Sequence, residues 1–205
     1  MHPNPAFRQA SLAQNQAFAR ARGFGILSVN GAEGPLAAHI PFEMTQDGAD
    51  VRLHLARSNP IARAALPAPA VLLVSGPDAY VSPDWYDTPD QVPTWNYVAV
   101  HLRGVLRAGA PESLLPHLDV VSDDFETRLL PKPPWRTAKM GDGVMDRMMR
   151  MILPFQIDLG SVEGTWKLNQ NKPAEARLAA AAELEAQSGP GAAAQIAALM
   201  RDLPE

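Results

Sequence analysis

The stretch GTWKLNQNKP, residues 164–173, separates a strand-like run from an alanine-rich helical pattern. It brings one Trp, two Lys, one Gln and two Asn to that boundary, so hydrogen-bond donors and acceptors are dense there. Free backbone N–H groups at a helix start can join such side chains in binding an anion. The alternative is a polar loop that only caps the helices after it. The stretch by itself leaves both interpretations open.

The residues on either side of this stretch predict regular structure. Upstream, FQIDLGSVEG at residues 155–164 alternates apolar and polar side chains, which is typical of a strand. Downstream, two alanine-rich helices are expected at about residues 174–187 and 191–203, with SGPG between them. The stretch therefore lies between a strand-rich body and a helical C-terminal part.

Further strands are predicted in the first half of the chain. GFGILSVN, LAAHIPFE and VRLHLA are joined by short turns, which predicts an antiparallel meander. In VRLHLA, Val51, Leu53 and Leu55 share one face, whereas Arg52 and His54 share the other. A buried strand over residues 70–76 and a long strand over residues 94–108 complete a β-rich body, and the sequence after Gly76 is expected to leave regular structure.

Helices are predicted around this body. Ser11 and Gln14 have the spacing of a capping box and begin a helix that ends at Gly23. Two more helices are expected over residues 111–126 and 142–152. In the second, we expect a methionine stripe and one Ile to pack into the core, namely Met145, Met148, Met149 and Ile152.

A second candidate anion site follows VRLHLA. Arg57, Ser58 and Asn59 come directly after the strand, and Pro60 occupies the first position of a predicted short helix. A guanidinium, a hydroxyl and free N–H groups at one helix start could hold a phosphate. The alternative is that Ser58 and Asn59 are caps and that Arg57 is solvated.

The long strand at residues 94–108 has one unusual face. This face carries Trp95, Tyr97, His101 and Arg103, and so many aromatic and functional side chains are unusual on a face that contacts only solvent. It fits a subunit interface or a ligand cavity.

The amino-acid composition excludes some classes of function. A chain of 205 residues with 46% hydrophobic and 20% charged residues predicts a globular protein with one domain by default. The absence of Cys excludes disulfides and thiolate chemistry, and a net charge of −4 without a basic tract does not support direct DNA binding. No apolar run is long enough to span a membrane, so a cytoplasmic protein is expected.

Catalytic and metal motifs are not recognisable. His39, His54 and His101 have no metal-ligand spacing, so no metal is predicted, and catalytic residues stay unknown. The remaining parts, two candidate anion sites and several aromatic residues, suit a flat phosphorylated ligand such as FMN.

Five segments in order, HIPFE, HLARSNP, YVSPDWY, VPTWNYVAVHLRG and GTWKLNQNKP, resemble the PaiB-type family of FMN-binding negative transcriptional regulators. The opening MHPNPAF is also similar, with His2 where the family commonly has Tyr. The likeness extends to about Arg177. We therefore expect an FMN-binding domain over residues 1–177 and a helical extension over residues 178–205.

The resemblance implies a mainly antiparallel split β-barrel with peripheral helices, related to pyridoxamine-phosphate oxidases and flavin reductases. It implies a homodimer with FMN at the subunit interface. By resemblance, the phosphate would be held by Arg57, Ser58 and Asn59. The flavin or its ribityl chain would be contacted by Lys167, Gln170 and Asn171, and Trp95 would line the interface or pocket. His54 is a further candidate contact, or a satisfied polar residue of the barrel.

Three functions stay open from the sequence. The resemblance implies a transcriptional regulator or flavin-dependent sensor. The fold relationship also allows an FMN-dependent oxidoreductase, in which the cofactor supplies the chemistry. A haem-binding protein with an axial His is a weaker alternative.

Overall fold

The computed structural model of the protein describes residues 1–203. Its strands are β1 (Phe24–Gly31), β2 (Gly34–Met44), β3 (Asp50–Ala56), β4 (Ala68–Val81), β5 (Thr94–Ala108) and β6 (Ile152–Lys167). Its α-helices are α1 (Leu12–Arg22), α2 (Leu114–Thr127), α3 (Val144–Met149), α4 (Ala174–Gln187) and α5 (Ala192–Arg201). Short 3-10 turns are η1 (Pro5–Phe7), η2 (Pro60–Arg63), η3 (Pro83–Tyr86), η4 (Pro111–Ser113) and η5 (Thr137–Lys139).

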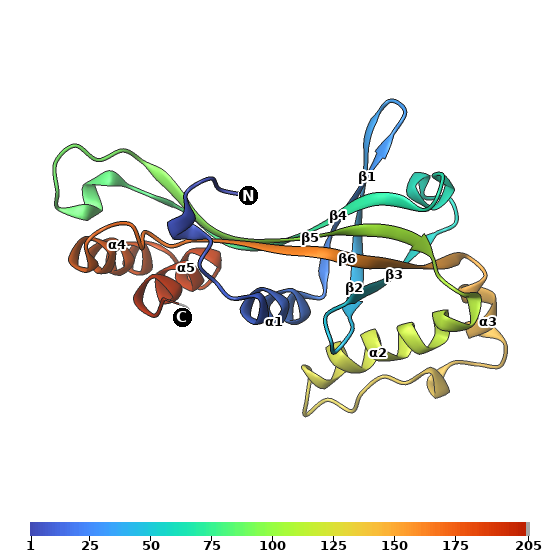
Figure 1. Ribbon diagram of the computed structural model, residues 1–205. Helices are drawn as coiled ribbons and strands as arrows, with labels where there is room; N and C mark the ends of the chain where they lie inside the picture. The colour runs from blue at the N-terminus through green and yellow to red at the C-terminus, as the bar shows by residue number, and fades with distance from the viewer. Residues whose placement is uncertain (204–205) are drawn as a thin grey trace. The chain divides into compact units, whose positions relative to one another are not determined.

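The strands form a closed barrel in the order β1-β2-β3-β6-β5-β4 (Figure 1). β1 pairs antiparallel with β2 and β4, and β3 pairs antiparallel with β2 and β6. The β1–β2 hairpin turns between Gly31 and Gly34, where the two strands come together. The expected antiparallel barrel with peripheral helices and a helical C-terminal part is confirmed.

The chain divides into two compact units, to which β4, β5 and β6 each contribute residues. We call Gln16–Val74 with Leu102–Val162 the barrel unit, and Met1–Asn15, Ser75–His101 and Glu163–Glu205 the terminal unit. The predicted boundary at Arg177 stays a prediction. Among the helices of residues 1–203, none is long and apolar enough to cross a membrane.

Strand alternation builds the core of the barrel unit. In β3, Val51, Leu53 and Leu55 are buried, whereas Arg52 on the alternate face is exposed. Burying apolar side chains of this size contributes about 1.5–3 kcal/mol each, which makes this face the main stabilising element. The other strands supply buried partners in the same way, among them Leu27, Ile40, Phe42, Leu72, Leu102, Leu106 and Ile157.

Helix α2 packs on β2 and β3 in the barrel unit, as Figure 1 shows. Leu114 and His117 are its buried residues, so the helix places a polar side chain as well as an apolar one against the outer face of the strands.

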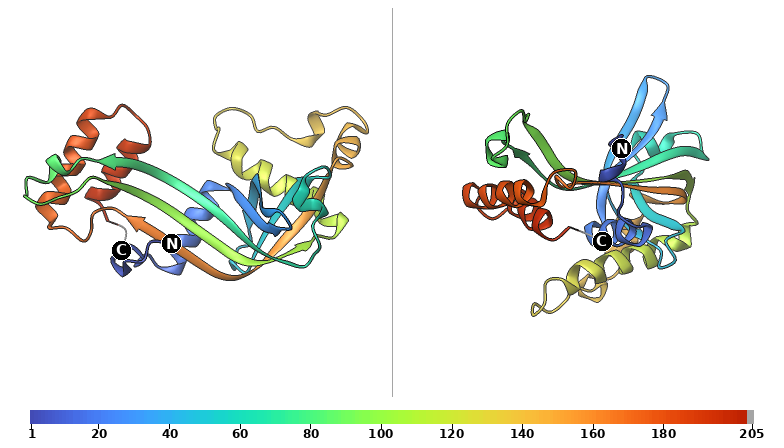
Figure 2. Two further views of the ribbon diagram at one scale, coloured as in Figure 1. Left: turned by 90° about the horizontal axis from the view of Figure 1, so that it is seen from above. Right: turned by 60° about the vertical axis from the view of Figure 1, so that its left-hand side comes forward.

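In the terminal unit, α4 and α5 lie side by side (Figure 2). Small side chains allow the two helices to approach closely, and the larger Leu184, Ile196 and Met200 fill the remaining space. Buried Asn96 on β5 donates from Nδ2 to Sδ of Met200, 3.3 Å away, which ties α5 to the sheet of this unit.

Several local predictions are confirmed. The capping box is present, because Ser11 N–H donates to Oε1 of Gln14 at 2.7 Å and Gln14 N–H donates to Oγ of Ser11 at 3.2 Å. Gly23, with φ of 56°, ends the helix as expected. The long strand has its predicted bounds, Thr94–Ala108, with Asn96, Val98 and other members of its predicted apolar face buried.

Other local predictions are wrong. β4 continues to Val81 instead of ending at Gly76, because sheet pairing overrides the local Gly and Pro signals. The helix expected after Asn59 is one 3-10 turn, η2. Helix α3 is shorter than expected and buries no residue, so its methionines do not enter the core.

Replacing Gly104 on β5 by Ala should destabilise the protein. A Cβ at this position would collide with the carbonyl oxygen of Asp158 and approach Cγ2 of Ile157 to 2.9 Å. Backbone cannot move away as a flexible side chain can, so we expect a loss of about 3 kcal/mol in urea unfolding.

The matched control is Gly160→Ala on β6, where the nearest atom, the carbonyl oxygen of Arg103, is 3.9 Å from the added Cβ. This variant should unfold within about 1 kcal/mol of the wild type. Equal stability of the two variants would contradict the close approach of β5 to β6.

Candidate functional site

The first candidate site is an arginine cluster at the end of β3. The ladder between β3 and β6 ends with Ala56 opposite Ile152. Directly after it, the backbone N–H of Arg57 donates to the carbonyl of Met151 at 3.0 Å, and its Nε donates to the carbonyl of Arg150 at 2.6 Å. The chain after α3 therefore fixes both the backbone and the guanidinium of Arg57.

Two more arginines lie next to Arg57. Nε of Arg63, in η2, donates to the carbonyl of Arg57 at 3.4 Å. Arg150 accepts from the Arg57 side chain through its backbone carbonyl and lines the same cavity as Arg57. Within residues 1–203, none of Arg57, Arg63 and Arg150 forms an ion pair with a carboxylate. Three uncompensated cations at one place favour an anion.

The two neighbouring polar residues differ. Asn59 caps η2, since its Oδ1 accepts from the N–H of Ile61 at 2.9 Å. Ser58 is exposed, and within the described chain its hydroxyl has no hydrogen-bond partner. The capping role of Asn59 is therefore present, and Ser58 is available to a ligand.

A cavity of about 400 Å³ adjoins the arginine cluster. Its lining contains Arg57, Arg150 and the acidic residue Asp146, which in the described part of the chain forms no ion pair with either arginine. Apolar side chains such as Leu66, Leu153 and Phe155 form much of the rest. This volume and the combination of charged and apolar walls are typical of small-ligand sites.

The second candidate site is a lysine pair in the terminal unit. Lys167 ends β6, and its Nζ bonds Oγ1 of Thr94 at the start of β5. Nζ of Lys172 bonds Oε1 of Gln91 and lies 4.2 Å from the centroid of the Tyr86 ring. In the chain up to residue 203, neither ammonium group has a carboxylate partner.

Charge and burial act together on this pair. Partial burial lowers the pKa of Lys167, and the nearby charge of Lys172 lowers it further. An anion between the two ammonium groups would relieve both effects, because it would compensate the like charges.

The loop that carries the pair is held by its own polar residues. Asn169 adopts a left-handed backbone conformation with φ of 61°, and its Nδ2 donates to the Tyr86 hydroxyl at 3.1 Å. Burial raises the pKa of Tyr86, so the phenol stays protonated as the acceptor. Oε1 of Gln170 accepts from the N–H of Leu168 at 2.7 Å, and its Nε2 donates to the carbonyl of Trp166.

The other predicted residues of this region lie at the surface. Asn171 is exposed on the same loop. Trp95 is 55% exposed and contacts Tyr80 edge-on, with ring centroids 6.2 Å apart. Flavin contacts from Gln170, Asn171 and Trp95 stay predictions.

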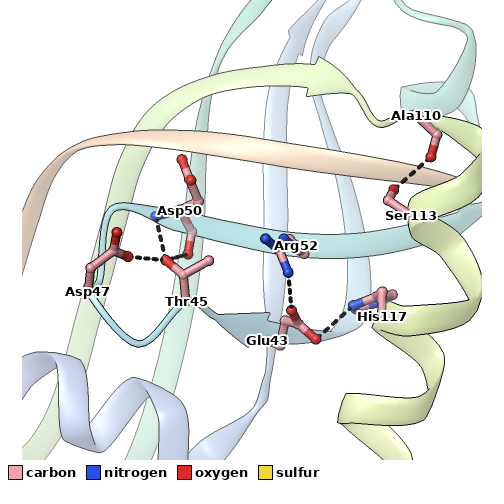
Figure 3. A network of polar contacts seen from close by, with 8 residues as sticks. All are labelled: Glu43, Thr45, Asp47, Asp50, Arg52, Ala110, Ser113 and His117. Atoms are coloured by element: carbon pink, nitrogen blue, oxygen red, sulfur yellow. Dashed lines mark hydrogen bonds and ion pairs between the residues drawn. The ribbon is translucent and has the colours of Figure 1, made fainter.

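His54 belongs to a different arrangement, a polar chain beneath α2. Its Nδ1 lies 3.0 Å from Nε2 of His117, a residue of α2 that is almost fully buried. Nδ1 of His117 faces Oε2 of Glu43 at 3.4 Å, and Oε1 of Glu43 accepts from Arg52 at 3.2 Å. Figure 3 shows Glu43 between Arg52 and His117. The polar contacts therefore run from His54 on β3 to His117 on α2, then to Glu43 on β2 and back to Arg52 on β3.

His54 disfavours an added proton. Burial lowers the pKa of His54, and the charge of His117 lowers it further. One consistent arrangement has neutral His54 donating to His117. Nδ1 of His117 and Oε2 of Glu43 face each other at 3.4 Å, but within residues 1–203 neither atom has a hydrogen bond. Within residues 1–203, no cluster of three or more His, Cys, Asp or Glu residues could hold a metal ion.

Sequence reasoning missed several residues of these sites. Arg63 and Arg150 complete the arginine cluster, and Thr94 and Lys172 complete the lysine environment. Only Lys172 had a local signal, its place within GTWKLNQNKP. The other residues meet through contacts between distant segments, which no spacing rule predicts.

The buried histidine chain should make stability depend on pH. The folded-state pKa of His54 lies below its ordinary value of 6.5, so the stabilisation is complete above about pH 6.5. It is lost as the pH falls through the lower folded-state pKa. The variant His54→Asn keeps an amide donor near His117 but cannot titrate, so its unfolding free energy should fall less than that of the wild type between about pH 7 and 5.

His39→Asn is the control, because His39 is an exposed residue of β2 that stacks on Phe24. Urea unfolding at each pH measures the free energy of unfolding of the wild type and of both variants. If His54→Asn and His39→Asn have the same pH dependence, the polar chain is not the source of the effect.

A comparison with protein families identifies this fold and sequence pattern. Residues 1–161 match the family described as "Putative FMN-binding domain". A relative in Bacillus subtilis, "Protease synthase and sporulation protein PAI 2", is 28% identical over 188 residues, covering 90% of this chain and 89% of the relative.

Solved structures have the same fold. The FAD and heme binding protein from Mycobacterium smegmatis superposes with a TM-score of 0.58 at 18% identity, covering 85% of this chain and 80% of that one. A flavocytochrome from Azotobacter vinelandii gives a TM-score of 0.56 at 13% identity, covering 81% and 72%. The barrel is thus one that flavin-binding proteins use, and because the family model matches most of the sequence, the chain belongs to the FMN-binding domain family.

Proposed function

We propose that this protein binds FMN and that the arginine cluster of Arg57, Arg63 and Arg150 holds the phosphate. The observation that carries the proposal is the absence of any carboxylate partner for these three groups within residues 1–203, beside a cavity of about 400 Å³. A phosphate would supply the missing negative charge, and the apolar wall suits a planar ring system.

The residues at this cluster have separate tasks in the proposal. Arg57 presents an oriented guanidinium, because its Nε is already bonded to the Arg150 carbonyl and its remaining N–H donors keep a restricted direction. The exposed hydroxyl of Ser58 can donate to the same anion. Asn59 acts indirectly, since it caps η2 and so positions the turn that carries Arg63.

The lysine pair has a supporting role in the proposal. Lys167 and Lys172 lie among Thr94, Gln91 and Tyr86, a set of donors and one aromatic ring that suits the polar edge of a flavin or its ribityl chain. When bound, FMN would supply redox chemistry, and these side chains would orient it.

For the biological role, we propose a homodimeric, PaiB-like regulator or flavin-dependent sensor. The name of the Bacillus subtilis relative refers to protease synthesis and sporulation, which fits regulation. The exposed Trp95–Tyr80 pair supports a subunit contact, because large exposed aromatic residues are enriched at interfaces. A net charge of −4 offers no general attraction to DNA, so binding to a promoter is a separate question.

Arg57→Ala and Lys167→Ala should each weaken FMN binding. The loss of one charge-assisted hydrogen bond costs about 1.5–3 kcal/mol, which corresponds to a roughly ten- to hundredfold increase in Kd. Flavin fluorescence quenching during titration measures the affinity, and the absorbance of the purified wild type after removal of free FMN measures the stoichiometry.

The controls are Arg22→Ala at the exposed end of α1 and Lys139→Ala in η5, both outside the two candidate sites. They should keep wild-type affinity. Wild-type affinity in Arg57→Ala would exclude the arginine cluster as the phosphate site, and the absence of retained flavin in the wild type would exclude FMN as the resident ligand.

The proposed dimer predicts twice the monomer mass of 22.1 kDa in light scattering. Trp95→Ser should shift the protein toward the monomer, because removing a buried interface aromatic commonly costs about 2 kcal/mol or more. The control is Val92→Ser, because Val92 is an exposed apolar residue just before β5. A wild-type protein that is monomeric at micromolar concentration would contradict the dimer.

Assays of the FMN-bound protein can distinguish a regulatory function from a catalytic one. Steady oxidation of NADH or NADPH would favour an FMN-dependent oxidoreductase. Binding to a promoter fragment that weakens with added salt, together with the absence of turnover, would favour the regulator.

A further inference from the structure

A methionine-lined cleft in the barrel unit adjoins the cavity at the arginine cluster, with which it shares Met149 and Ile152. Its volume is about 420 Å³, and α2, η5, α3 and the residues between them form its walls. Trp135 and residues of α2 line one part, and the lining includes five of the eight methionines of the chain, Met140, Met145, Met148, Met149 and Met151.

The methionines differ strongly in exposure. Met151 is 67% exposed and Met148 is 54% exposed, whereas Met44 is 8% exposed and Met200 is fully buried. Reactivity of a thioether toward peroxide requires access, so we expect Met148 and Met151 to react faster than the buried Met44 and Met200. The chain has no Cys, so no thiol competes for the oxidant.

Helix α3 lies at this cleft. It has six residues and buries none of them, and a helix of this length has little stability of its own. Its methionines line the cleft together with apolar residues such as Leu118 and Ile152, so its position depends on the apolar character of this surface. A polar oxygen on a methionine of α3, or on Met151 directly after it, would weaken that support.

The end of α3 is bonded to the arginine cluster. The carbonyl of Met151 accepts the backbone N–H of Arg57 at 3.0 Å, and the carbonyl of Arg150 accepts Nε of Arg57 at 2.6 Å. A change in the position of α3 therefore reaches the residue proposed to hold the phosphate.

We propose that Met148 and Met151 form an oxidation site through which hydrogen peroxide loosens α3 and releases Arg57. In the reaction, a lone pair of the thioether sulfur attacks one peroxide oxygen, the S–O bond forms and the O–O bond breaks. The departing hydroxide takes the proton from the hydroxyl group that is now bonded to sulfur and becomes water. The sulfur loses two electrons to the peroxide, and the product is methionine sulfoxide, which is polar and reducible.

The test treats the full-length protein with hydrogen peroxide and maps the added oxygen by peptide mass spectrometry. Met148 and Met151 should be oxidised on the order of tenfold faster than Met44 and Met200, which are internal controls. Amide hydrogen exchange over residues 144–151 should then be about tenfold faster than in the untreated protein.

The double variant Met148→Leu/Met151→Leu keeps apolar side chains of similar volume but cannot form sulfoxides. Peroxide should leave its exchange over residues 144–151 unchanged. The variant Met44→Leu is the matched control and should retain the wild-type response.

Three results would overturn the proposal: equal oxidation of Met44 and Met200, oxidation of Met148 and Met151 without faster exchange, or faster exchange in the treated double variant. The effect on FMN affinity rests on the proposed function, whereas the oxidation and exchange results do not. A protein that binds no FMN but shows the exchange response would therefore reject the proposed function and keep the oxidation site.

Discussion

The pairing of β3 with β6 is the contact on which the rest of the structure depends. It joins residues 50–56 to residues 152–158, and with it the strand ring closes. Ring closure pairs β3 along its length and buries its alternate apolar face. Where the ladder ends, its hydrogen bonds continue from Arg57 to Met151, so the strand that closes the barrel also positions the arginine cluster.

Basic side chains without acidic partners occur at both candidate sites. Several other basic side chains do have such partners, for example Arg52 with Glu43 and Arg107 with Asp158. The arginine cluster and the lysine pair have none within residues 1–203. Like charges that the fold holds near one another cost electrostatic free energy, and a bound anion would offset that cost.

Two further features of the barrel unit lie at α2. One is the polar chain beneath the helix, and the other is the methionine cleft beside it. The chain from His54 through His117 to Glu43 is polar and largely buried, and within residues 1–203 Nδ1 of His117 and Oε2 of Glu43 have no hydrogen bond. The methionine cleft is apolar and partly open. The first is predicted to respond to protons and the second is proposed to respond to oxidants. Both involve residues of α2, which packs on β2 and β3.

Much of the fold could be predicted from the sequence. The alternation in residues 51–55, the capping box at Ser11 and the strand over residues 94–108 are local patterns, because strand and helix periods depend on neighbouring residues. The ordered motifs also predicted the antiparallel barrel. The extension of β4 to Val81 and the short α3 could not be predicted, since sheet pairing and the lack of a buried face overrode local propensity.

The sequence alone determined which residues are candidates for ligand binding, including Arg57, Ser58 and Lys167, because residue type and motif order are properties of the chain. Only the tertiary structure decided their partners. It placed Arg150 with Arg57, Thr94 with Lys167, and His117 with His54, pairs that are 93, 73 and 63 residues apart. Hydrogen bonding and burial act through space, so these pairs, and the pKa values of His54 and Lys167, follow from the folded structure.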